Sequence, residues 1–367
     1  MNALRNTLLR TVLLIGAFVV MVAPVRGEVS GSFNLGTGYL AHPIGISDET
    51  ETGYLYQMLR LSVGSIKGDN AFKLGYEGQA SQFGKDTQLG SQRHGLGVEW
   101  FHNSADRRTV LSGGIQGAVR RHEDWYQAYD HDEGFAYLAF KKFVGSRTLW
   151  KGFAGLRLRK YDDLPEESYR EPHGELEVQR FSENRTTLGL KVRYGWKQFN
   201  DDVASQVWET LKLPSTSQLA ARLSFSKGLS ERTGLRTWAE YRWKLSEFPY
   251  YVADDVYDSP VLDHYATEGY DLLVALKTLV PWQFWFEAGS SLGEYDYGEI
   301  QFPTTDGAGE GRNDTVWEIF GSLQRTFGKD LGRPKLSLMG GWRDQDSNLD
   351  WYRYSGVFFS TNLAWKF

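Results

Sequence analysis

The sequence contains no cysteine. Disulfides therefore cannot stabilise it, which excludes a small disulfide-stapled extracellular domain. Covalently attached haem and a bacterial lipoprotein's lipid anchor are excluded as well, because both need a cysteine. Long hydrophobic runs are also missing beyond the start of the chain, since no later segment approaches the roughly 20 apolar residues that a membrane-spanning helix needs.

The start of the chain has the composition of a secretion signal. Arg5 and Arg10 precede an apolar stretch at residues 11–23, which is too short to span a bilayer as a helix. We expect cleavage after Gly27. Cleavage after Ala23 is one alternative, although a proline would follow the cut, and an uncleaved anchor is another. The prediction is a signal peptide over 1–27 and a single folded domain over 28–367.

The composition combines low hydropathy with many aromatic residues. Mean hydropathy is −0.45, yet aromatics make up 15% of the chain and there are 40 glycines. A closed transmembrane barrel accounts for this mixture, because only every second strand residue faces lipid and aromatics gather at the two membrane interfaces. Glycines relieve crowding where strands bend or pack closely.

The carboxyl-terminal residues alternate between two kinds of side chain, the period of a strand with two different faces. Similar alternation recurs along the chain. A soluble barrel would have to bury the many charges of the polar face, whereas a membrane barrel places the apolar face outside and the polar face in a wet lumen. One terminal face carries Val357, Phe359, Thr361, Leu363, Trp365 and Phe367, and the other Phe358, Ser360, Asn362, Ala364 and Lys366.

The alternating segments predict an all-β fold of about sixteen strands, arranged as a transmembrane antiparallel up-and-down barrel. Short connections alternate with long ones, as in outer-membrane barrels with short periplasmic turns and long external loops. An even strand number would place both termini in the periplasm. The predicted strands are 30–40, 54–66, 71–83, 92–102, 109–121, 133–143, 149–160, 174–182, 186–199, 217–227, 233–246, 268–278, 282–294, 314–327, 334–345 and 351–367.

With its secretion signal, amphipathic hairpins and terminal aromatic residue, the chain resembles bacterial outer-membrane barrels, and more narrowly the sixteen-stranded porin-like members. The resemblance implies the outer membrane of a Gram-negative bacterium. It also implies that Phe367 belongs to the signal read by the barrel-insertion machinery. Such porins often form trimers, but no feature of the sequence decides the oligomeric state.

Among the charged strand residues that we expect to face the lumen, basic ones outnumber acidic ones about two to one. Rings of Arg or Lys are the usual device of anion pores, and Arg binds carboxylates through two parallel hydrogen bonds. The alternative is that these bases pair with lumenal acids in a salt-bridge network. The predicted pore-lining residues are Arg157, Arg159, Lys191, Arg193, Arg222, Arg236 and Arg242.

The long loops are acidic, and one of them has helical spacing. Acidic external loops could bridge to lipopolysaccharide through divalent cations, or could be plain solvated surface. An acidic mouth would repel the anions that a basic lumen attracts. In the loop 200–214 a helix is predicted, which could constrict the pore or lie on the rim. Its apolar positions are Val203, Val207, Trp208 and Leu211.

One predicted loop contains residues that could serve in hydrolysis. Asp254-Asp255 and Asp263-His264 share one predicted external loop, which is similar to the acid pair and Asp-His dyad of omptin proteases. Those barrels have about ten strands, fewer than are predicted here. No zinc, phosphate-loop or dinucleotide motif is present, so we predict no catalytic residue, no metal and no cofactor.

The sequence thus predicts an outer-membrane channel that passes hydrophilic, anionic solutes by diffusion. Three alternatives stay open: an export pore for an acidic exopolysaccharide with periplasmic partners, a structural barrel with a plugged lumen, and an outer-membrane hydrolase. The expected partners are outer-membrane lipid, lipopolysaccharide and the barrel-insertion machinery, with no nucleic acid.

Overall fold

The computed structural model describes residues 28–40, 52–84, 90–165, 168–200, 215–245, 267–297, 311–328 and 333–367. Within these residues the chain forms sixteen strands and three short 3-10 turns. The strands are β1 (Glu28–Leu40), β2 (Thr52–Lys67), β3 (Asn70–Phe83), β4 (Ser91–Asn103), β5 (Thr109–His122), β6 (His131–Val144), β7 (Thr148–Tyr161), β8 (Tyr169–Phe181), β9 (Thr186–Phe199), β10 (Thr216–Gly228), β11 (Thr233–Lys244), β12 (Glu268–Val280), β13 (Phe284–Asp296), β14 (Asn313–Thr326), β15 (Lys335–Ser347) and β16 (Tyr354–Lys366). The turns are η2 (Asp124–Tyr129), η5 (Pro281–Gln283) and η7 (Asp350–Tyr352).

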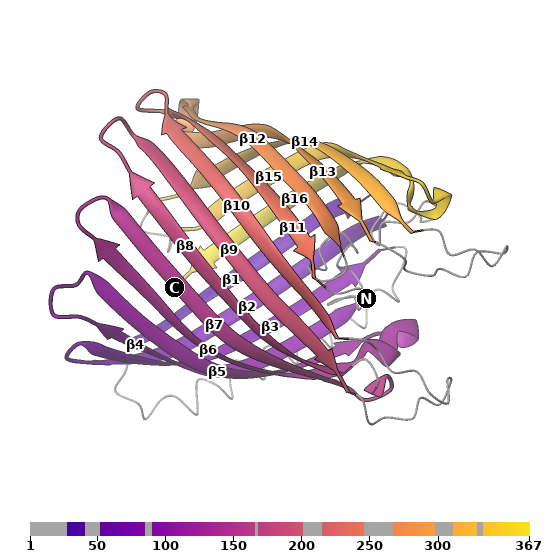
Figure 1. The fold of residues 1–367 in the computed structure, drawn as a ribbon, viewed down its shortest axis with the longest axis horizontal. Coiled ribbons are helices and arrows are strands. Elements are labelled where there is room, and N and C mark those ends of the chain that lie inside the picture. Colours follow the sequence, from indigo (N-terminus) through magenta and orange to yellow (C-terminus); the bar gives the residue numbers. More distant parts are fainter. Residues whose placement is uncertain are drawn as a thin grey trace.

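The sixteen strands form one closed antiparallel barrel (Figure 1). Each strand pairs with the strands that precede and follow it in the sequence, so the connections are simple hairpins. The ring closes where β1 pairs with β16, from Ser32 opposite Lys366 to Leu40 opposite Phe358. The up-and-down barrel predicted from the alternation is therefore confirmed.

The start of β1 and the end of β16 lie at the end of the barrel that carries the short turns, on the left in Figure 1. Phe367 exchanges two backbone hydrogen bonds with Gly31, at 2.7 and 3.0 Å between nitrogen and oxygen. One of the short turns at this end joins β2 to β3 through Gly68 and Asp69, and φ of Gly68 is +60°. This positive φ is the conformation that favours glycine in tight hairpins.

The outer surface is apolar. Ile115, Leu138 and Leu223 are each at least 60% exposed, which would be costly if water surrounded the barrel. Exposed tryptophans lie toward both rims, with Trp150 and Trp365 near the short turns and Trp243 at the opposite ends. An apolar belt between two aromatic girdles is the exterior of an outer-membrane barrel, and the structure accordingly places the chain in an outer membrane.

None of the helical segments seen among the described residues could serve as a membrane span.

Two strand boundaries differ from the predicted ones by more than two residues. β8 begins at Tyr169 rather than at 174, although Pro172 lies inside it. The ladder to β9 tolerates this proline because it skips residues 171 and 172 and resumes at His173 opposite Gly195. β16 begins at Tyr354 because the preceding residues form η7 instead of extended backbone.

Gly269 in β12 provides a test of the barrel's backbone packing. Its φ is +156°, and a Cβ at this position would lie 1.9 Å from the carbonyl oxygen of Glu294. We expect Gly269→Ala to lower the free energy of unfolding by about 1–3 kcal/mol, because backbone cannot move aside as a side chain can. Urea titration of the barrel in lipid vesicles measures the change.

The matched control is Gly117→Ala in β5, where a Cβ would meet only the carbonyl oxygen of Glu133 at 4.0 Å. This variant should unfold at the same urea concentration as the original chain or at a slightly higher one. Equal destabilisation by both substitutions would contradict the strain assigned to Gly269.

Candidate functional site: the charged lumen

Ion pairs between strands that are not neighbours identify the inner face of the barrel. Arg193 of β9 contacts Glu240 of β11 at 2.6 Å, and Arg236 of β11 contacts Glu287 of β13 at 2.7 Å. In each case one whole strand lies between the partners. Side chains diverge on the convex side of a curved sheet, so contacts across an intervening strand occur only on the concave, lumenal side.

All seven basic residues predicted to line the pore share this inner face. They lie on four strands of one side of the barrel, and the positions that alternate with them are outward apolar residues such as Leu158, Leu190 and Leu223. β8, between two of these strands, contributes acids to the same face. Arg157 and Arg159 come from β7, Lys191 and Arg193 from β9, Arg222 from β10, and Arg236 and Arg242 from β11.

The Glu240 cluster is the most buried part of this wall. The Glu240 carboxylate receives Arg193 at 2.6 Å, Arg222 at 2.7 Å and Arg242 at 3.2 Å, and its side chain has no exposed surface. Arg242 also pairs with Asp271 on the neighbouring β12. Three guanidinium groups therefore share two carboxylates, and the cluster carries a surplus of positive charge.

The Glu133 cluster repeats this arrangement on β4, β6 and β7. Glu133 pairs with Arg159 at 2.9 Å, Arg93 at 3.3 Å and Arg157 at 3.8 Å. Arg157 continues to Glu171 of β8 at 3.2 Å. Glu133 thus has the same role here as Glu240 in the other cluster, holding several guanidinium groups within reach of one another.

Each of the seven bases has an acidic partner. Lys191 pairs with Glu175 at 2.7 Å, which completes the set together with the two clusters and Arg236. The salt-bridge network that the sequence left open as an alternative is therefore present. Positive potential on this wall must arise from the surplus of cations over acids, since none of the seven is an isolated charge.

An aromatic stack, which was not predicted from the sequence, lies on the same inner face. Phe135, Tyr137, Phe153 and His173 lie with ring centroids 5.3 to 6.2 Å apart. The alternation could have found the first three, because they fall on the same face as Glu133 and Arg157. His173 lay outside the predicted strand 174–182, which began too late.

Several sequence predictions fall outside the described residues. The constriction candidates Val203, Val207, Trp208 and Leu211 lie there, and so do the Asp254-Asp255 and Asp263-His264 pairs and the signal peptide at 1–27. In the described ranges, no group of three or more His, Cys, Asp or Glu side chains could hold a metal ion.

No protein-family model matches the chain, and no curated protein does. Solved structures match it in fold. The outer membrane protein OpdK of Pseudomonas aeruginosa is 13% identical, with a TM-score of 0.52 over 93% of this chain and 99% of OpdK. OccAB1 of Acinetobacter baumannii is 8% identical, with a TM-score of 0.55 over 93% and 96%. OccK2 of P. aeruginosa in complex with glucuronate is 12% identical, with a TM-score of 0.51 over 93% and 97%. Identities this low show a shared barrel fold.

Neutralising Glu240 tests whether the clusters hold the wall together. We expect Glu240→Gln to lower the free energy of unfolding by about 3 kcal/mol, because three arginines lose their shared buried counter-charge. Urea titration in lipid vesicles measures the loss.

Glu183→Gln is the control. Its carboxylate, in the exposed turn between β8 and β9, pairs with Arg147 in the turn between β6 and β7, where solvent screens the interaction. The stability of this variant should stay close to that of the original chain. If the two substitutions have equal effects, the Glu240 cluster does not stabilise the barrel.

Proposed function

We propose that this barrel is an outer-membrane channel that passes small hydrophilic anions by diffusion. The observation that carries the proposal is the Glu240 cluster, in which three lumenal arginines share two carboxylates. The Glu133 cluster adds a second site of the same kind on the same side of the barrel.

The excess of positive charge on the lumenal wall would favour anions over cations in the pore. A low-dielectric wall around a narrow aqueous path focuses its charge and raises the local concentration of counter-ions. Arginines that are already held in place by acids lose little conformational entropy when a passing carboxylate contacts their guanidinium groups. The glucuronate bound to OccK2 is an anion of the class that such a wall would favour.

The transport we propose is passive and needs no cofactor. The short turns would face the periplasm, and the ends of β1 and β16 would lie on that side with them. Lipopolysaccharide would contact the outer rim, and the barrel-insertion machinery would read Phe367. We propose no enzymatic activity.

One feature favours the export of an acidic polysaccharide as a second candidate function. Ion pairs succeed one another around the wall, from Arg60 with Glu77 on β2 and β3 to Arg236 with Glu287 on β11 and β13. The aromatic stack lies beside them. A sugar polymer that passes through the lumen could contact several of these arginines at once, with periplasmic proteins supplying the chain.

Current through planar bilayers tests the proposed function. The original chain should conduct with a preference for chloride over potassium. The double substitution Arg193→Gln with Arg222→Gln should lower the anion-to-cation permeability ratio about two- to fivefold, because it removes two cations and leaves Glu240 in place. Reversal potentials in a salt gradient give the ratio.

The control is Lys227→Gln, an exposed residue on the outward face of β10. It should leave the ratio unchanged. Cation preference in the original chain would refute the anion channel. Current that arises only after deletion of the loop 200–214 would favour the exporter, and absence of current in both forms would favour a plugged structural barrel.

A further inference from the structure

The lumenal wall formed by β14, β15, β16 and β1 differs from the basic wall. Away from the rims, the inner positions described on these four strands carry one acid, Glu318, and one base, Arg343. The other positions are apolar or uncharged. This wall thus has a single acid and a single base among uncharged residues, whereas several charges share each cluster on the other side of the barrel.

Glu318 and Arg343 are direct partners in the register of β14 and β15. Their Cβ atoms should therefore lie about 4.5–5.5 Å apart on the same face. Even so, among the described residues no hydrogen bond or ion pair joins the two side chains, whereas Arg236 reaches Glu287 across a whole strand at 2.7 Å. The Arg343 Nε is buried and has no hydrogen-bond partner.

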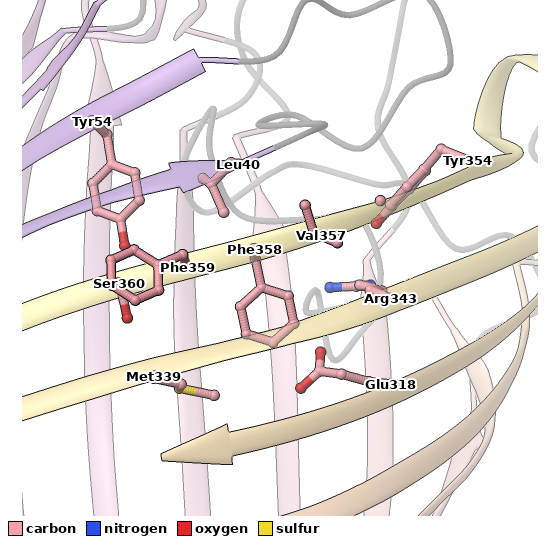
Figure 2. Close-up of a pocket in the computed structure, with 11 residues that line it drawn as sticks. Leu40, Tyr54, Glu318, Met339, Arg343, Tyr354, Val357, Phe358, Phe359 and Ser360 are labelled. Atoms are coloured by element: carbon pink, nitrogen blue, oxygen red, sulfur yellow. The ribbon is translucent and has the colours of Figure 1, made fainter. Parts of the chain in front are cut away.

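The two charges line a pocket in the wall. Figure 2 shows both side chains beside the ring of Phe358, with Met339 and Tyr354 nearby. The pocket has a volume of about 340 Å³, near the lower end of the range for small-molecule sites. Its lining is apolar apart from the two charges and a few hydroxyl groups, so it suits a small ligand with an apolar body.

We propose that this pocket, the dipolar pocket, binds zwitterions of the α-amino acid type with an apolar side chain. The ligand's carboxylate would pair with Arg343 and its ammonium group with Glu318. Its apolar side chain would lie against Phe358 and Met339.

The charge arrangement selects for both ends of the ligand. A simple anion on Arg343 would be repelled by the neighbouring Glu318 carboxylate, and a simple cation on Glu318 would be repelled by Arg343. The Arg343 guanidinium lies over the Tyr354 ring at 5.9 Å, but neither it nor the Glu318 carboxylate has an ion-pair partner among the described residues. A charge without a counter-charge among apolar groups is costly, and a zwitterion supplies one to each in a single step. The site therefore differs in ligand class from the basic wall, which favours anions.

The inference rests on the proposed function in one respect, that small solutes can enter the lumen. Binding is measured without current, so the two proposals can fail separately. The assay is isothermal titration of the full chain, folded in detergent micelles, with L-phenylalanine. The comparison ligands are 3-phenylpropionate, which lacks the amine, and phenethylamine, which lacks the carboxylate. L-phenylalanine should bind at least about tenfold more tightly than either.

Two substitutions test which side chain binds the ammonium group of the ligand and which binds its carboxylate. Glu318→Gln should weaken L-phenylalanine binding about tenfold and leave 3-phenylpropionate no weaker than before. Arg343→Gln should weaken L-phenylalanine equally and leave phenethylamine no weaker. Lys335→Gln, on the same inner face of β15 but near the turn end, should change none of the three affinities.

The comparison of ligands on the original chain needs no variant to fold. If L-phenylalanine does not bind, or binds no better than its two relatives, the proposal is wrong. It is also wrong if L-phenylalanine affinity is unchanged in folded Glu318→Gln and Arg343→Gln barrels, folding being checked by circular dichroism.

Discussion

Backbone closure between β1 and β16 is the constraint on which the rest of this structure depends. A hydrocarbon interior offers no water to an unpaired amide, so a sheet can span it only without free edges. The register from Ser32 opposite Lys366 to Leu40 opposite Phe358 removes both edges at once. Closure also divides every strand into an outward and an inward set of side chains, which separates the lipid surface from the lumen.

The inward set is not uniform around the ring. On one side, Glu133 and Glu240 each hold three arginines, and the wall is stiffened by charge pairs whose sum is positive. On the other side, the inner positions described away from the rims are uncharged except for Glu318 and Arg343. A solute in the lumen would therefore meet a polar track on one wall and an apolar, dipolar surface on the other.

Much of the fold could be predicted because a strand's period of two is local information. The strand 186–199 was predicted with the bounds that the structure has, since Leu190, Val192 and Tyr194 alternate with Lys191 and Arg193. The predicted start of the strand 174–182 was wrong, because β8 begins at Tyr169. Pairing extends this strand past Pro172, which lies opposite Leu156 of β7, while the ladder to β9 skips residues 171 and 172.

Only part of the candidate site could be predicted from the alternation of residues. The parity of the residues placed Arg193, Arg236 and Arg242 on the polar face, yet it could not say which acid each would contact. Glu240 is 47 residues from Arg193, and Glu287 is 51 residues from Arg236. These contacts depend on barrel curvature, which brings alternate strands together on the concave side only.

The sequence by itself determined that this chain is a barrel with an apolar exterior and a charged interior, because the alternation of apolar and polar residues depends only on neighbours in the sequence. Only the tertiary structure decided that the seven expected bases are paired and that Glu318 and Arg343 are not. Ion pairing depends on distances between strands far apart in sequence, and those distances exist only after the ring has closed.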